Sequence, residues 1–122
     1  MQRFEFQPCH RLLTKQDFSR VFDVCSLRVG RGSILLLALP NKLPHPRLGL
    51  VVRKKFIASA AGRNQFKRIA RERFRLSQHG LPALDIVVLN RSGSDSLNKD
   101  QLHNLFANAL DALAKKANET NV

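Results

Sequence analysis

The chain has 122 residues, of which 21 are Lys or Arg and 9 are Asp or Glu, so its formal net charge is +12. This length fits one domain with one hydrophobic core, and an apolar fraction of 43% argues against a chain that is disordered throughout. No apolar run approaches the roughly 20 residues that span a bilayer, and so large a positive charge favours nucleic acid over a membrane surface as the partner.

The chain opens with a polar, irregular segment, and we expect residues 1–13 to be extended. Charged residues are scattered through this segment with no apolar stretch between them. It therefore lacks the features of a secretory signal, and we expect a cytoplasmic location. Cys9 and Cys25 have no histidines at the spacing of a zinc site, which favours free thiols in a reducing compartment.

A short first helix is predicted from Thr14 to about Val24. Thr14 is a suitable N-cap, with Asp17 at the third helical position. Apolar residues then follow at helical spacing, at Phe18, Val21, Phe22 and Cys25. The spacing alone favours a core role for Phe18 and Phe22.

Three strands are predicted along the middle of the chain. The continuous apolar run at 34–39 is typical of a strand that is covered on both faces. Residues 47–52 resume as a strand after a proline-rich turn, and 85–89 (DIVVL) form a third strand. Residues 26–33 contain two glycines among arginines, which predicts a loop or an irregular entry to a strand.

The stretch 62–77 (GRNQFKRIARERFRLS) is predicted to be a basic helix, with Ser59 as a plausible cap. Between residues 53 and 75 there are nine Lys or Arg and one acid, Glu72. On a helical wheel, one sector about 100° wide holds Asn64, Lys67, Arg68, Arg71 and Arg75. The opposite side holds Phe66, Ile69, Ala70, Phe74 and Leu76. An ordinary solvated face is the alternative, but charge of one sign favours contact with a polyanion.

A last amphipathic helix is predicted after Asn98, which has Gln101 at the third helical position. Its apolar positions are Leu102, Leu105, Phe106, Ala109, Leu110 and Leu113. No repeat or linker divides the chain, so we expect a single domain over 1–122 with frayed ends at 1–10 and 116–122. The strand–helix–strand unit at 47–89 would have a right-handed crossover by the general rule.

Four segments, in order along the chain, carry a family resemblance: RLLTKQDFSRVF, HPRLGL, GRNQFKRIARERFR and LPALDIVVLNR. Together they resemble the protein subunit of bacterial ribonuclease P, a family with an Arg-Asn-Arg-x-Lys-Arg-x-x-Arg motif on its second helix. The matching positions run from Arg63 to Arg71, and Gln65 stands where the motif has its second Arg. Gln keeps hydrogen bonding but lacks the cation and the planar fork that binds phosphate.

The resemblance implies an α+β fold of the ribosomal-protein-S5-domain-2-like type. Its mixed four-stranded sheet has elements in the order αβββαβα, with a left-handed βαβ crossover against the general rule. One strand more is implied than the patterns predict, and we expect it within residues 27–43.

The resemblance also implies the function. The chain would be a subunit of an endoribonuclease, a ribonucleoprotein that removes the 5′ leader of precursor tRNA. Catalysis would reside in the RNA subunit, with Mg²⁺ held mainly by that RNA, and the acids and histidines of this chain show no catalytic or metal-ligand spacing. A ribosomal or general structured-RNA-binding protein is the alternative; a membrane or DNA partner is not expected.

Two groups of site residues follow from the resemblance. The RNA subunit would bind Arg63, Asn64, Gln65, Lys67, Arg68, Arg71 and Arg75. A cleft between the sheet and the first helix would bind the single-stranded leader through Arg11, Phe18, Phe22, Arg53, Lys54 and Lys55. Aromatic faces stack on unpaired bases. For Phe18 and for Phe22 alike, a core role and a place in the cleft wall are therefore equally expected.

Overall fold

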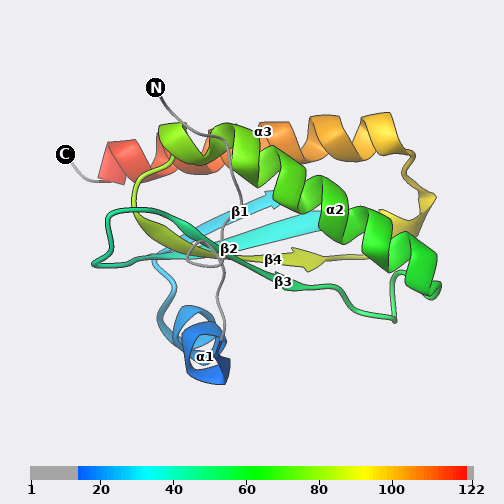
Figure 1. The fold of residues 1–122 in the computed structure, drawn as a ribbon, viewed down its shortest axis with the longest axis horizontal. Helices are drawn as coiled ribbons and strands as arrows, with labels where there is room; N and C mark the ends of the chain where they lie inside the picture. Colours follow the sequence, from blue (N-terminus) through cyan, green and yellow to red (C-terminus); the bar gives the residue numbers. More distant parts are fainter. Residues whose placement is uncertain (1–13, 121–122) are drawn as a thin grey trace.

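A computed structural model describes residues 14–120. The helices and strands are α1 (Lys15–Val24), β1 (Leu27–Arg31), β2 (Ile34–Pro40), β3 (Arg47–Val51), α2 (Ala60–Ser77), β4 (Leu84–Asn90) and α3 (Lys99–Thr120). Two short 3-10 turns, η2 (Gln78–Gly80) and η3 (Ser94–Ser96), flank β4. The order αβββαβα makes an α+β fold, as expected (Figure 1).

The four strands form one mixed sheet in the order β1-β2-β4-β3. β2 is antiparallel to both β1 and β4, whereas β3 and β4 are parallel and are connected through α2. Because β3 and β4 run in the same direction, their carboxyl ends lie together, with Val51 paired to Leu89. The loop at 52–59 therefore leaves the sheet next to the end of β4.

The three long helices begin at the caps that the sequence predicts. Thr14 and Ser59 each accept a hydrogen bond from the backbone N–H three residues later, at 3.1 and 3.0 Å. Asn98 and Gln101 form a reciprocal capping box, with N···O distances of 2.9 and 2.8 Å. These bonds satisfy backbone donors that a helix start otherwise leaves unpaired.

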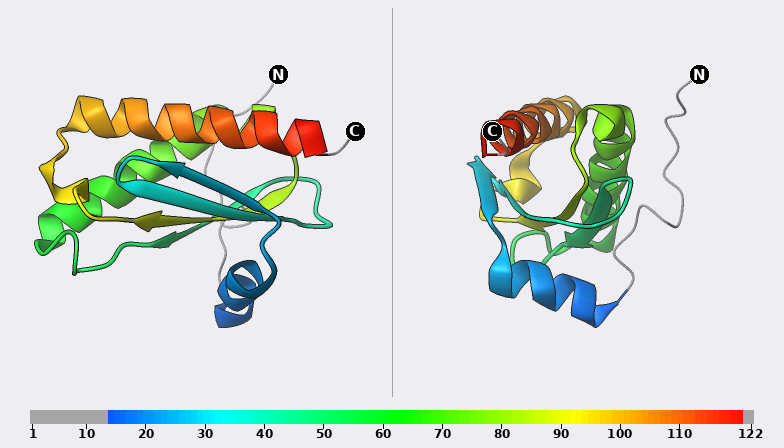
Figure 2. Two further views of the ribbon diagram at one scale, coloured as in Figure 1. Left: turned by 180° about the vertical axis from the view of Figure 1, so that it is seen from behind. Right: turned by 90° about the vertical axis from the view of Figure 1, so that its left-hand side faces the viewer.

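The two faces of the sheet carry separate apolar cores. The larger core lies under α2 and α3, where Phe66, Phe74 and Phe106 are fully buried, and the rings of Phe66 and Phe106 meet edge to face at 5.1 Å. The smaller core lies on the opposite face, where α1 places Val21 against the sheet. Figure 2 shows α1 on one side of the sheet and both other helices on the other.

The fourth strand, β1, lies inside the region 27–43 where the resemblance implies it. Its buried Leu27 and Val29 alternate with exposed Arg28 and Gly30. The apolar half of this alternation is only two residues long, and glycine is uncommon in strand interiors, so the pattern predicts a loop or an irregular entry to a strand where the structure has an edge strand.

Two further expectations about the helices differ from the structure. Leu76, assigned to the apolar side of the basic helix, is 43% exposed because it borders the groove between α2 and α3 without entering the core. Residues from 116 onward were expected to fray, yet α3 continues to Thr120. Ala117 is buried in the larger core, and this packing extends the helix. The expected fraying of 1–10 lies outside the described residues.

Candidate nucleic-acid interface

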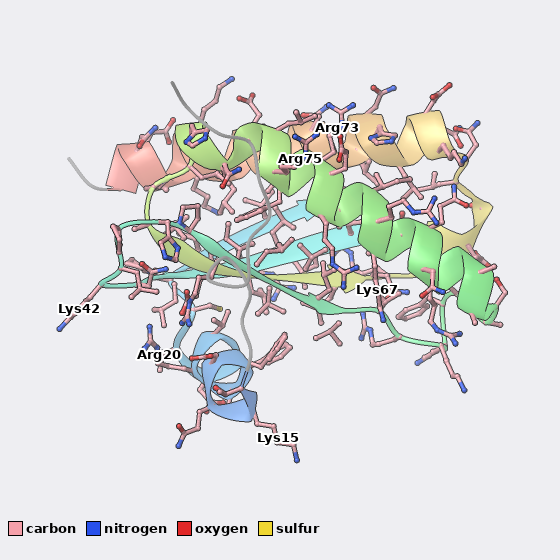
Figure 3. All side chains as sticks on the ribbon, in the orientation of Figure 1. Lys15, Arg20, Lys42, Lys67, Arg73 and Arg75 are labelled. Carbon is pink, nitrogen blue, oxygen red and sulfur yellow. The ribbon has the colours of Figure 1, made fainter. Side chains whose placement is uncertain are left out.

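The outer side of α2 presents a row of polar and cationic side chains, as the wheel predicts. Asn64, Arg68 and Arg71 are exposed and Lys67 is half-buried. Residues three and four apart lie next to one another on a helix, so these four side chains form one surface. We call Asn64, Lys67, Arg68 and Arg71 the α2 cationic face; Figure 3 shows Lys67 on it.

Arg63 belongs to the predicted set but is directed to the loop before α2. Its Nη1 donates hydrogen bonds to the carbonyl oxygens of Ile57 and Ala58, at 3.0 and 2.7 Å. A charge-assisted bond of this kind is stronger than a neutral one. Arg63 therefore fixes the loop at 52–59 against the first turn of α2, next to the α2 cationic face.

Arg75, another predicted residue, is joined to the acid of the same helix. Its Nη2 lies 2.7 Å from Oε1 of Glu72, and its Nε donates to Oε2 at 3.3 Å. The hydrogen bond from Arg75 holds the pKa of Glu72 below its ordinary value and raises the pKa of Arg75. The pair cancels one positive charge at the C-terminal end of the basic stretch.

Gln65 is half-buried and lies away from the α2 cationic face. It borders a groove of about 310 Å³ together with Ser59, Asp95 and Leu97. Successive residues on a helix are separated by about 100°, so Gln65 faces α3 and η3 while Asn64 faces outward. Compared with the family motif, this chain therefore lacks one cation on the side of α2 that lies nearest Asp95.

Two of the three cations after β3, Arg53 and Lys55, are held by the end of β4 or by one aromatic ring. The backbone N–H of Arg53 donates to Oδ1 of the buried Asn90 at 2.7 Å, and Nδ2 of Asn90 returns a bond to Arg53 O at 3.1 Å. The Arg53 guanidinium donates to the carbonyl oxygen of Asn90 and lies 4.8 Å from the Phe56 ring centre. Lys55 approaches the same ring at 5.5 Å, and Lys54 and Lys55 are exposed.

Neither Asn90 nor Phe56 is among the predicted site residues. Asn90 lies in the segment LPALDIVVLNR, which carries part of the family resemblance. Its position at the end of a buried strand was the sequence signal that could have identified it. Its side chain extends the pairing of β3 and β4 by one residue and so sets where Arg53 leaves the sheet.

The two phenylalanines of α1 have different environments. Phe18 is half-buried and packs against the smaller core, together with Val51 at the end of β3. Phe22 is 43% exposed. Arg53 follows Val51 by two residues, so the chain that carries these cations leaves the sheet at the edge of the smaller core against which Phe18 packs. Arg11, the remaining residue predicted for the cleft, lies outside the described residues.

A network of charges that the sequence did not predict holds α1 on the sheet. Arg47 of β3 binds the buried carboxylate of Asp85 through two hydrogen bonds, of 2.8 and 2.7 Å, and reaches Asp17 of α1 at 3.3 Å. Arg20 of α1 lies 3.7 Å from the same Asp85 carboxylate. A groove of about 550 Å³ adjoins this network, lined by Arg20, Leu39, Pro40, Asn41, Lys42, Leu43 and Arg47.

Within residues 14–120, no group of three or more His, Cys, Asp or Glu side chains is placed to hold a metal ion. In the same part of the chain, none of the helices has the length and apolarity needed to cross a bilayer.

Comparison with known proteins places this geometry in one family. The family model described as Ribonuclease P matches residues 6–116. The chain is 47% identical to the protein called Ribonuclease P protein component in Saccharophagus degradans, over 93% of this chain and 84% of that protein. It is also 47% identical to the protein of the same name in Photobacterium profundum, over 87% of this chain and 89% of that one.

Solved structures agree. The Staphylococcus aureus RNase P protein superposes with a TM-score of 0.76 at 29% identity, covering 88% of this chain and 94% of that one. The Thermotoga maritima RNase P protein superposes with a TM-score of 0.72 at 28% identity, covering 86% and 96%.

Proposed function

The chain belongs to the ribonuclease P protein family, and from that premise we propose that it is the protein component of the ribonuclease P ribonucleoprotein. In this role it binds the catalytic RNA subunit and precursor tRNA and assists the endonucleolytic removal of the 5′ leader. The observation that carries the proposal is the match over residues 6–116 together with the outward-facing α2 cationic face.

The α2 cationic face is the proposed contact with the RNA subunit. Lys67, Arg68 and Arg71 can neutralise phosphates and release the counterions condensed on them, a gain that does not depend on base sequence. Asn64 adds a hydrogen-bonding side chain on the same surface. Arg63 contributes by fixing the neighbouring loop, and Arg75 contacts the RNA as part of its ion pair with Glu72. Gln65 supplies hydrogen bonds to the RNA from the edge of the α2 cationic face.

The side of the sheet that carries α1 is the proposed path of the leader. Phe22 offers an exposed aromatic face to an unpaired base, and Arg53, Lys54 and Lys55 offer cations to the backbone at the end of β3. Stacking on an aromatic side chain contributes about 1–3 kcal/mol per base and tolerates any sequence. A surface of this kind suits leaders that differ from one tRNA to the next.

The hydrolytic chemistry is proposed to reside in the RNA subunit. Mg²⁺ prefers oxygen ligands, with one or two carboxylates completed by water and phosphate. Glu72 and Asp85 do not fit this need, because Glu72 is paired with Arg75 and Asp85 is paired with Arg47. We therefore assign the Mg²⁺ ions mainly to RNA phosphates; the part of this chain is to hold RNA and leader.

Two finer features of the fold are part of the proposal. We propose a left-handed β3–α2–β4 crossover, of the ribosomal-protein-S5-domain-2-like class. In Figures 1 and 2, α2 lies above the sheet and the chain steps from the outer β3 to the inner β4, which supports that handedness. A cytoplasmic location is proposed from the tRNA-processing role.

A reconstituted cleavage assay tests the function. Precursor tRNA is incubated at low Mg²⁺ with the ribonuclease P RNA of a relative such as Saccharophagus degradans, with and without this chain. We expect the chain to speed leader removal by that RNA and to cleave nothing alone. A chain that binds ribosomal RNA tightly, is indifferent to a 5′ leader and stimulates no ribonuclease P RNA would be the general RNA-binding protein instead.

A further inference from the structure

The outer edge of β1 carries a second cluster of cations, which none of the site assignments above uses. Its members come from three segments: the edge strand itself, the turn after β4 and the C-terminal half of α3. They are Arg28, Arg31, Arg91, Lys115 and Lys116. We call these five residues the β1–α3 patch.

Hydrogen bonds tie these segments together into one surface. Lys116 of α3 donates through Nζ to the carbonyl oxygen of Arg28 at 2.8 Å. Arg91 donates through Nη2 to the carbonyl oxygen of Gly32 at 2.8 Å. The Arg91 guanidinium also lies against Gly30, where an added Cβ would be only 3.0 Å from Nη2. Gly30 therefore leaves the space that lets Arg91 lie on the edge strand.

An open groove of about 380 Å³ runs along this edge. Its lining residues are Arg28, Val29, Gly30, Arg31, Ala112, Lys115, Lys116 and Glu119. Val29 is buried and Ala112 half-buried, and no aromatic ring lines the groove. Protein–protein hot spots are usually built around aromatic anchors, whereas the charged side chains that line this groove are four cations and one acid, Glu119.

The charges of the patch are not balanced. Lys115 is paired with Asp111 at 3.2 Å, and Glu119 is the other nearby acid. Within residues 14–120, Arg28, Arg31 and Arg91 form no ion pair with a carboxylate. Surfaces shaped only for solubility intersperse both signs, and a cluster of one sign opposes folding through self-repulsion. A polyanionic partner would relieve that repulsion.

The patch and the α2 cationic face lie on different sides of the molecule. β1 and β3 are the two opposite edges of the sheet, separated by three strand spacings, or roughly 15 Å. The right-hand view of Figure 2 shows β1 beneath α3 on one side and α2 on the other. One straight segment of RNA backbone cannot cover both surfaces.

We infer that the β1–α3 patch binds a second phosphate-backbone segment of the RNA subunit, so that the protein bridges two separate segments of that RNA. This inference rests on the proposed function, because it takes the same RNA as the partner. Arg and Lys bind phosphates without regard to sequence, and all five members of the β1–α3 patch are Arg or Lys.

The test compares three double variants of the full chain in binding to the ribonuclease P RNA over a range of salt concentrations. Arg28→Ala/Arg31→Ala removes two cations from the patch, and Arg68→Ala/Arg71→Ala removes two from α2. Lys42→Ala/Lys99→Ala is the matched control, because both lysines are exposed and belong to neither surface. Hydroxyl-radical footprints of the RNA are recorded with each protein.

Each phosphate contact contributes about 0.9 to the slope of log K against log salt. Between about 50 and 200 mM salt, the wild type should therefore lose roughly tenfold more affinity than Arg28→Ala/Arg31→Ala. That variant should also lose protection of nucleotides that Arg68→Ala/Arg71→Ala still protects. A slope and a footprint equal to those of the lysine control would overturn the inference.

Failure of the proposed function would have a different signature, because the wild type itself would then neither bind nor stimulate the RNA. If Arg28→Ala/Arg31→Ala unfolds at a lower temperature than the wild type, Arg31→Gln/Lys115→Gln replaces it. Within residues 14–120, Arg31 bonds to Gly30 of its own strand and Lys115 pairs with Asp111 of its own helix. The variant Arg31→Gln/Lys115→Gln must then show the same reduction of the salt slope and the same loss of nucleotide protection.

Discussion

Arg47 and Asp85 form a bidentate ion pair across the parallel strands β3 and β4, with Nε···Oδ1 and Nη2···Oδ2 distances of 2.8 and 2.7 Å. The Asp85 side chain is 1% exposed and that of Arg47 is 18% exposed. Through Asp17 and Arg20, the same pair reaches α1. The ion pair therefore connects the sheet to the helix that forms one wall of the proposed leader path.

Asp85→Asn should lower the stability of the fold and reduce its sensitivity to acid. Breaking a buried pair leaves a charge without a partner and costs up to about 3–5 kcal/mol, with the lower figure expected for a partly exposed arginine. Burial alone would raise the pKa of Asp85, but bonds from Arg47 and Asn41 and the charge of Arg20 hold it below its ordinary value. The carboxylate thus stabilises the fold above about pH 4, and this contribution is lost as the pH falls through the lowered pKa.

Urea unfolding of both proteins between about pH 7 and pH 3 measures this effect. The wild type should lose more stability than Asp85→Asn over the acid part of that range. Asp111→Asn is the control, because its exposed pair with Lys115 should contribute less than about 1 kcal/mol. Parallel losses for the wild type and Asp85→Asn would show that another carboxylate dominates the acid response.

Arg68→Ala and Arg63→Ala should weaken RNA binding in different ways. Arg68 is exposed on the α2 cationic face, so its loss should reduce the salt slope by about 0.9 and leave the melting temperature unchanged. Arg63 holds two carbonyl oxygens of the loop, so its loss should lower the melting temperature as well. Salt titrations paired with thermal melts separate the two, and an unchanged slope for Arg68→Ala would make that residue structural.

Glu72→Gln should tighten binding to the RNA subunit. Glutamine releases Arg75 from its ion pair and adds one unit of positive charge beside the α2 cationic face, so the salt slope should steepen by up to about 0.9. Losing the i,i+3 pair should cost less than about 0.5 kcal/mol of stability. Asp100→Asn makes the same change of charge at an exposed site on α3. Equal effects of both variants would mean that only net charge matters.

Local sequence signals were sufficient to predict where the helices of this chain begin. Thr14, Ser59 and Asn98 cap the helices as predicted, because a cap depends on residues within one turn. The buried runs at 34–39 and 85–89 are likewise β2 and β4. β1 was not predicted from its pattern, since arginines and a glycine occupy its exposed positions.

The partners of the cations could not be predicted in the same way. Arg47 and Asp85 are 38 residues apart in the chain, and only the parallel pairing of β3 and β4 brings them together. The wheel assigned Arg75 to the RNA-binding face without showing that Glu72 pairs with it. A basic stretch in a sequence therefore indicates a polyanion partner, but it does not tell which of its cations are already engaged within the fold.

Gln65→Arg restores the family motif and should steepen the salt slope by about one contact if this position reaches RNA. Gln65 lies on the side of α2 that borders Asp95, so an arginine there has a competing carboxylate nearby. Asn104→Arg, at an exposed site on α3, adds the same charge elsewhere. Titrations of both variants decide the matter: a steeper slope for Gln65→Arg alone places position 65 at the RNA, whereas equal slopes place it outside the contact.

Phe22→Ala should weaken binding of precursor tRNA with a long leader, by about 1–3 kcal/mol for each base that stacks on the ring. Since Phe22 is 43% exposed, the stability of the fold should change little. Phe18 packs against the sheet, so Phe18→Ala should destabilise the protein by about 2 kcal/mol, less than the 3–5 kcal/mol of a fully buried Phe. Its effect on substrates with and without a leader should be more nearly equal.

Binding of leadered and leaderless substrates to the reconstituted complex, together with the unfolding free energy of each variant, separates these two roles. Both variants remove the same side-chain atoms from one helix, one turn apart, so each serves as the control of the other. A leader-dependent loss confined to Phe22→Ala would make Phe22 the stacking surface and Phe18 the support that holds α1 on the sheet. The reverse result would place the bases deeper, at the smaller core against which Phe18 and Val51 pack.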